Sequence, residues 1–160
     1  MDITIDVEEY KLNVRAACVI IHNNKILLHK NENSNHYAII GGRVEIGEDS
    51  ENTVIREIKE EIGKNIKITG YIATIENFFK MKNKKYHEIL FVHKAEFINE
   101  EDKKITTTLK NIEGKDYLKY EWVDLADIDN VNLMPANLKK ILKEGKFPTH
   151  EIYSELKQEN

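Results

Sequence analysis

Six glutamates are crowded into the stretch GGRVEIGEDSENTVIREIKEEIG, residues 41–63. Three of them, Glu57, Glu60 and Glu61, follow one another at spacings that place them on one side of a helix. Like charges one turn apart destabilise a helix by about 0.2–0.5 kcal/mol, and Glu60 and Glu61 also lie near the negative end of the helix dipole. A solvated acidic face would leave this repulsion in place, whereas a bound cation would offset it.

The glycines before this helix favour the cation. Gly41 and Gly42 follow an apolar run, and glycine allows the backbone to approach a ligand closely. A backbone carbonyl and three carboxylates would form a set of oxygen ligands, which the hard cations Mg²⁺ and Mn²⁺ prefer. The like charges one turn apart and the glutamates near the negative end of the helix dipole are both unfavourable for a helix. Because they coincide here, the stretch indicates a functional site rather than a structural helix alone.

The helix that carries these glutamates is predicted over residues 51–62, where the apolar period becomes that of a helix. Asp49 or Ser50 can accept hydrogen bonds from its free N–H groups, and Gly63 fits just past its last turn. The apolar residues that recur at helical spacing, and that we expect to be buried, are Val54, Ile55, Ile58 and Ile62.

Runs of β-branched and apolar residues predict strands in the rest of the chain. The predicted strands cover residues 14–22, 25–30, 36–40, 67–79, 87–98 and 117–125. The Asn23–Asn24 pair predicts a hairpin turn, and a lysine-rich turn is predicted over residues 80–85. Residues 100–116 are polar and predict a mobile loop.

A short amphipathic helix is predicted after Pro135 and ends at Gly145, and residues 149–160 are a candidate for one more. Strands that enclose one helix and precede another favour an α/β fold, with layers of helix against a mixed sheet. At 160 residues, the chain is expected to form a single domain, residues 1–160.

The composition, with 41% hydrophobic and 32% charged residues, is typical of a globular protein. A net charge of −4 is too small to indicate a nucleic-acid or membrane partner. The lone cysteine, Cys18, lies in an apolar run and cannot form an internal disulfide, which favours a reducing compartment. Residues 1–13 are acidic and lack the apolar region of a signal peptide, so we expect a cytoplasmic protein without a membrane span.

Residues 42–64 resemble the Nudix box, G-x5-E-x7-R-E-U-x-E-E-x-G-U, in which U is a bulky aliphatic residue. The positions of fixed identity are filled by Gly42, Glu48, Arg56, Glu57, Glu60, Glu61 and Gly63. Lys64 departs from the pattern where an aliphatic residue is usual, and Ile40 stands where many members have proline. Neither departure touches the expected ligands.

The resemblance extends to later segments of MutT-like members and covers about residues 14–142. It is carried there by ENFF before YHEILFV, and by EWVDLADI before LMPANLKKIL. The resemblance implies an α/β/α sandwich that hydrolyses a nucleoside diphosphate linked to another moiety. It also implies a small-molecule nucleotide as partner, and a homodimer, since members of the family often dimerise.

The same resemblance implies roles for the box residues. Glu57, Glu60 and Glu61 are expected to bind Mg²⁺ together with the Gly41 carbonyl, with Mn²⁺ as a substitute, and Arg56 is expected to brace the carboxylates. Glu57, Glu60 and Arg56 are therefore candidate catalytic residues.

The general base stays open from sequence alone. Some members use the first Glu of the box pair, here Glu57, and others use a Glu on a late loop. We favour Glu113, which lies beside Gly114 in the predicted mobile loop. Glu121 and Glu88 are the alternatives.

Three residues are candidates for substrate binding. Arg15 could reach a phosphate, Phe79 or its neighbour Phe78 could stack a base, and Asn137 resembles the purine-reading Asn of a MutT-like enzyme. Each also has a plain structural interpretation, as a surface, core or helix-start residue.

A rival hypothesis is a Nudix-fold binding or regulatory module without turnover. Such modules usually lose carboxylates of the box, and this chain keeps all of them. The sequence leaves the substrate open among nucleoside triphosphates, ADP-ribose, dinucleoside polyphosphates and capped RNA.

Overall fold

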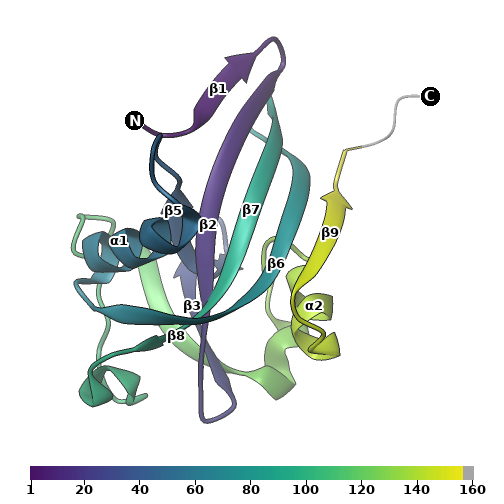
Figure 1. The fold of residues 1–160 in the computed structure, drawn as a ribbon. Helices are drawn as coiled ribbons and strands as arrows, with labels where there is room; N and C mark the ends of the chain where they lie inside the picture. Colours follow the sequence, from purple (N-terminus) through teal and green to yellow (C-terminus); the bar gives the residue numbers. More distant parts are fainter. Residues whose placement is uncertain (157–160) are drawn as a thin grey trace.

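The computed structural model describes residues 1–156 of the chain (Figure 1). Its strands are β1 (Thr4–Val7), β2 (Tyr10–His22), β3 (Lys25–Asn31), β4 (His36–Ala38), β5 (Ile40–Arg43), β6 (Ile66–Met81), β7 (Lys84–Phe97), β8 (Leu118–Asp124) and β9 (Thr149–Ser154). Its helices are α1 (Ser50–Ile62) and α2 (Leu138–Glu144), with two short 3-10 helices, η1 (Glu100–Lys103) and η2 (Leu125–Asn130).

Within this described part, the strands join into one mixed sheet. The main path runs β4-β3-β2-β7-β6-β9, while β1 and β5 pair with β2, and β8 pairs with β3. The β2–β7 and β6–β9 pairs are parallel, whereas β6–β7 and β2–β5 are antiparallel. The mixed sheet predicted from the strand pattern is therefore confirmed.

The two helices cover opposite faces of this sheet (Figure 1). Side chains of β2 alternate between the faces, as the period of two in a strand requires. On one face, Cys18 and its alternate neighbours pack in a hydrophobic cluster with Val54 and Ile58 of α1. On the other face, Val19 belongs to a cluster with Leu138 of α2. This arrangement is the α/β fold that the sequence predicts.

The helix α1 follows its local sequence signals closely. The Asp49 carboxylate accepts a hydrogen bond from the Asn52 N–H at 2.8 Å, and Gly63 ends the helix in the left-handed region at φ 70°. Of the four apolar residues predicted to be buried, Ile55 is an exception, with 38% of its surface exposed. At about 100° per residue it falls at the edge of the apolar stripe.

The hairpin between β2 and β3 is confirmed, because Asn23 and Asn24 both have positive φ, 49° and 60°, as a tight two-residue turn requires. The lysine-rich turn is shorter than predicted. Ladder pairing of β6 with β7 continues through Lys80–Lys85 to Met81–Lys84, so the turn itself is residues 82–83.

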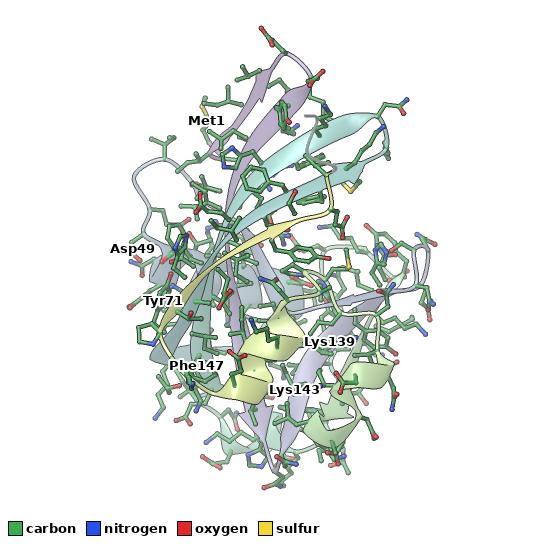
Figure 2. The ribbon with its side chains drawn as sticks, turned by 90° about the vertical axis from the view of Figure 1, so that its right-hand side faces the viewer. Met1, Asp49, Tyr71, Lys139, Lys143 and Phe147 are labelled. Atoms are coloured by element: carbon green, nitrogen blue, oxygen red, sulfur yellow. The ribbon has the colours of Figure 1, made fainter. Side chains whose placement is uncertain are left out.

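The predicted helix at residues 149–160 is wrong for its first half. Residues 149–154 form β9, which pairs with β6 and whose side chains alternate between partly buried and exposed positions. Figure 2 shows the chain passing from α2, which carries Lys139 and Lys143, past Phe147 to β9. Residues 157–160 lie outside the described part of the chain.

Some elements have no counterpart in the sequence prediction, among them η2, which follows β8. Residues 4–13 form β1 and the first part of β2, and η1 lies inside the segment predicted to be a loop. None of the helices in residues 1–156 is long and apolar enough to cross a membrane.

Candidate functional site

A cavity of about 970 Å³ brings together segments that are far apart in the sequence. The predicted site residues that line it are Arg15, Gly41, Glu57, Glu61, Phe79 and Glu113. Three other predicted residues within the described chain, Arg56, Glu60 and Asn137, do not line it. The cavity is therefore where carboxylates, a cationic side chain and an aromatic ring meet.

Glu57 reaches this cavity over the backbone of Gly42. A Cβ atom built on Gly42 would lie 2.1 Å from the Glu57 Cδ and 2.2 Å and 2.4 Å from its two oxygens. The absence of a side chain at Gly42 thus makes the space for the carboxylate. Burial raises the pKa of Glu57, the neighbouring Arg56 opposes this shift, and the charges of Glu60 and Glu61 add to it.

Arg56 links α1 to the loop before it. Its Nε and Nη2 atoms donate to the two oxygens of Glu48, each at 2.9 Å. Its Nη1 donates to Glu57 at 2.8 Å and Glu60 at 3.1 Å, and Nη2 also donates to the Arg43 carbonyl at 3.0 Å. A forked guanidinium of this kind sets the directions of several carboxylates at once.

Glu48 is held in its charged form by this contact. Hydrogen bonding to Arg56 lowers the pKa of Glu48 to about 2, helped by the Thr53 hydroxyl and the Glu45 N–H and opposed by burial. A carboxyl whose pKa is lowered on folding contributes stability above its unfolded pKa and loses it as the pH falls toward the folded pKa.

Glu48→Gln is therefore expected to lower the free energy of unfolding by about 3 kcal/mol at pH 7, from the size of this pKa shift. The difference from the wild type should shrink between pH 4.5, the ordinary value, and a pH of about 2. Urea unfolding across this range measures it, with the exposed Glu144→Gln as control. A difference that does not change with pH would contradict the assignment.

Glu61 lies buried at the other end of the acidic face. Its Oε1 accepts a hydrogen bond from the Tyr120 hydroxyl at 2.7 Å and lies 3.1 Å from Nδ1 of His29. Burial and the adjacent Glu61 charge raise the pKa of Tyr120, so its hydroxyl stays protonated and can donate.

The loop that carries Glu113 is tied to Glu61. The Asn111 amide donates to the Tyr120 hydroxyl at 3.2 Å, and its Oδ1 accepts from the N–H groups of Glu113 and Lys115 at 2.9 Å and 3.0 Å. The Ile112 N–H donates to the Glu61 carbonyl at 2.8 Å. Glu113 is thus held at the cavity by contacts that converge on one carboxylate-bearing turn of α1.

The two alternative bases lie in different surroundings. Glu121 does not line the cavity, and its carboxylate accepts a hydrogen bond from the Tyr37 hydroxyl at 3.0 Å. Glu88 does line it but is only 3% exposed, and its oxygens accept from the amides of Asn13 at 2.9 Å and Asn77 at 3.3 Å.

Asn137 begins α2 with both of its side-chain polar atoms shielded from solvent and without a hydrogen-bond partner in residues 1–156. Pro135 and Met134, just before it, line the cavity. The structure does not bring the Asn137 amide to the cavity with them.

A family model described as the NUDIX domain matches residues 12–145. The chain belongs to the Nudix family.

Sequence matches to known proteins support this assignment to the Nudix family. The chain is 39% identical over 75 residues to an ADP-ribose pyrophosphatase of Methanocaldococcus jannaschii, a match that covers 42% of this chain and 44% of the relative. It is 38% identical over 64 residues to the NAD-capped RNA hydrolase NudC of Pectobacterium carotovorum, covering 37% of this chain and 25% of the relative. The matches thus span less than half of each curated relative.

The fold matches that of a MutT protein from Bacillus halodurans with a TM-score of 0.63. The two chains are 20% identical, and the match covers 89% of this chain and 91% of the other. At this identity the likeness shows the Nudix fold alone.

Nudix hydrolases generally use divalent metals, and the residues at this cavity fit one. No three His, Cys, Asp or Glu side chains in residues 1–156 are already gathered into a complete metal cage. However, Arg56 and Tyr120 bind only the Oε1 atoms of Glu57 and Glu61, and no described residue donates to either Oε2. Two carboxylates beside one cavity, one of them crowded by like charges, form a donor set suited to Mg²⁺.

Several residues of this Nudix site carry no signal in the sequence. His29, Asn111 and Tyr120 contact Glu61 or its neighbours but stand at no recognisable spacing from the box. Asn13 and Asn77 are likewise identified as partners of Glu88 only by strand pairing.

Proposed function

We propose that this chain catalyses the Mg²⁺-dependent hydrolysis of the diphosphate linkage in a nucleoside diphosphate derivative, with water attacking phosphorus. The observation that carries the proposal is one cavity lined by Glu57, Glu61, Arg15, Phe79 and Glu113. The relatives' names support the substrate class, since ADP-ribose and NAD are both nucleoside diphosphate derivatives.

In this proposal Glu57 and Glu61, whose Oε2 atoms receive no hydrogen bond from the described residues, would hold the metal together with the Gly41 carbonyl. Glu60 would join them only by leaving Arg56, to which it is bound. A bound Mg²⁺ supplies charge neutralisation at the phosphate oxygens and lowers the pKa of bound water. Arg56 orients Glu57, Arg15 binds a phosphate, and Phe79 stacks against the base.

Glu113 is proposed as the general base, because it faces the cavity from a loop that Asn111 and Ile112 fix to Glu61. Glu113→Gln is expected to lower kcat by about a hundredfold and to leave KM nearly unchanged, since general bases contribute roughly that much. Glu121→Gln, whose carboxylate lies outside the cavity, is the matched control and should keep its activity. A larger loss in the control than in Glu113→Gln would assign the base to Glu121 instead.

The reaction is tested by incubating the chain with ADP-ribose, NADH, dinucleoside polyphosphates, nucleoside triphosphates and capped RNA, each with Mg²⁺. Mass spectrometry should detect release of a nucleoside monophosphate from at least one of them, and EDTA should abolish it. Binding of these compounds without turnover would instead establish a binding module.

The location, assembly and partners stay predictions. We expect a cytoplasmic enzyme acting on a small nucleotide, with a homodimer as its assembly and Mn²⁺ as a substitute metal.

A further inference from the structure

Three polar side chains form a row across the sheet inside the cavity. Strand pairing places Asn13 of β2 and Asn77 of β6 on either side of Glu88 on β7. Both amides donate to the Glu88 carboxylate, and all three residues line the cavity. None of them belongs to the Nudix box, and the proposed hydrolysis assigns them no role.

Hydrogen bonds within this row hold the Glu88 carboxylate in a fixed orientation as an acceptor. Arg43 donates from Nε to Oδ1 of Asn13 at 3.1 Å, which turns the Asn13 NH₂ group toward Glu88. Each Glu88 oxygen receives one amide hydrogen and keeps capacity for another donor. A carboxylate so deeply buried is expected to have its hydrogen bonds completed by a neighbour or a ligand.

A second observation points to a missing donor. Asn77 is 6% exposed, and its Oδ1 has no hydrogen-bond partner among the described residues. Buried acceptors without a partner are rare in folded proteins. The two Glu88 oxygens, each with capacity for one more donor, therefore suit two neighbouring hydroxyl donors, and the unpaired Asn77 Oδ1 marks the same row as incompletely hydrogen-bonded.

The neighbours of this row show which part of a nucleotide would reach it. Side chains two residues apart share one face of a strand, about 7 Å from each other. On one side of the row lies Arg15, two residues along β2. On the other side lie Phe79 and Tyr86, a cross-strand pair whose rings stack with centroids 4.8 Å apart. Arg15, the row that contains Glu88, and the Phe79–Tyr86 pair therefore follow one another along the sheet in the same order as the phosphate, ribose and base of a nucleotide.

We propose that Asn13, Glu88 and Asn77 form a ribose-binding triad, in which the two amides orient the Glu88 carboxylate and Glu88 accepts hydrogen bonds from the vicinal hydroxyls of a nucleotide. The proposal rests on the proposed function for the places of phosphate and base. A 2′-deoxyribose supplies one hydroxyl fewer and leaves one buried acceptor without a partner. The site should therefore select ribonucleotides over 2′-deoxyribonucleotides.

Calorimetric titration of the full chain with AMP and 2′-dAMP tests this selection. Neither monophosphate contains a diphosphate linkage, so binding is measured without turnover. A hydroxyl bonded to a charged group predicts that the wild type binds AMP about ten- to a hundredfold more tightly than 2′-dAMP. Glu88→Gln should remove this difference by weakening AMP binding alone.

Glu96→Gln is the matched control, because Glu96 lies on the same strand and pairs with Lys67 at 2.8 Å outside the cavity. It should keep the preference for AMP. Asn77→Ala provides a second variant in case Glu88→Gln does not fold, and it should narrow the preference for AMP by removing one of the two amides that orient the Glu88 carboxylate.

Equal binding of AMP and 2′-dAMP by the wild type, including no binding of either, would overturn the triad. A Glu88→Gln variant that weakens the binding of AMP and 2′-dAMP equally would also overturn it. The same holds if Glu88→Gln changes the preference between AMP and GMP, measured in the same way, because the triad would then recognise the base rather than the ribose. Failure of the proposed function is distinguishable: ribose selection without hydrolysis of any diphosphate would retain the triad, and hydrolysis without ribose selection would reject it.

Discussion

Glu57→Gln and Glu61→Gln are each expected to lower kcat/KM by about a thousandfold, because a metal contributes several kcal/mol to transition-state stabilisation. Each substitution keeps the size and shape of the side chain and removes one negative charge from the cavity. In the proposed site the two carboxylates share the cation, so losing either weakens the anchor for both phosphate and water.

Although Glu57→Gln should lower activity, it should not lower the stability of the metal-free protein. The pKa of Glu57 is raised by burial and by the charges of Glu60 and Glu61, so the ionised carboxylate disfavours the folded state at neutral pH. Glu57→Gln should therefore melt at the same temperature as the wild type or slightly higher when Mg²⁺ is absent. The wild type should melt at a higher temperature with Mg²⁺ than without it, and both variants should lose most of this rise.

Melting with Mg²⁺ or EDTA, paired with turnover, measures both effects on the same samples. Glu51→Gln on the exposed side of α1 is the matched control and should behave like the wild type. Wild-type turnover that survives EDTA, or Gln variants that turn over normally, would reject the metal site.

The parts of this fold that follow from the sequence are those with short-range causes. The caps of α1 depend on Asp49 and Gly63, which act within a few residues of themselves. The turn at Asn23–Asn24 depends on two residues that tolerate positive φ. The C-terminal half of the Nudix box works in the same way, because helical spacing alone brings Glu57, Glu60 and Glu61 to one side of α1.

The parts that do not follow depend on strand register. Asn13 and Glu88 are 75 residues apart, and only the parallel pairing of β2 with β7 places them together. The strand β9 is likewise defined by its pairing with β6 rather than by a strong pattern of its own. Helical spacing also groups Glu60 with Glu57, but only the position of Gly42 beneath the helix shows which of the two reaches the cavity.

Alanine substitutions at Gly41 and Gly42 should have different effects, one on the stability of the fold and the other on activity. Neither Gly41 nor Gly42 has positive φ, so each is required for space rather than for its backbone conformation. A Cβ on Gly41 would lie 2.1 Å from the Ala16 carbonyl oxygen and 2.5 Å from the Ala17 Cα. These are backbone atoms of the paired strand β2, which can move only if the β2–β5 pairing opens. Gly41→Ala is therefore expected to destabilise the fold by about 3 kcal/mol.

Gly42→Ala should lower activity and leave stability nearly unchanged. The atoms that its Cβ would meet are the carboxylate end of Glu57, a flexible side chain that can turn away. The melting temperature should change little, whereas kcat/KM should fall about as far as in Glu57→Gln because the carboxylate is displaced from the cavity.

A double-mutant cycle tests whether Gly42 acts through Glu57. Adding Gly42→Ala to Glu57→Gln should cost little further activity, since the group that it displaces has already lost its charge. Losses that multiply in the double variant would show that Gly42 serves the reaction by another route. A large fall in the melting temperature of Gly42→Ala alone would show that Glu57 cannot leave its place, and the close approach would then be structural rather than a device for admitting a metal-binding carboxylate.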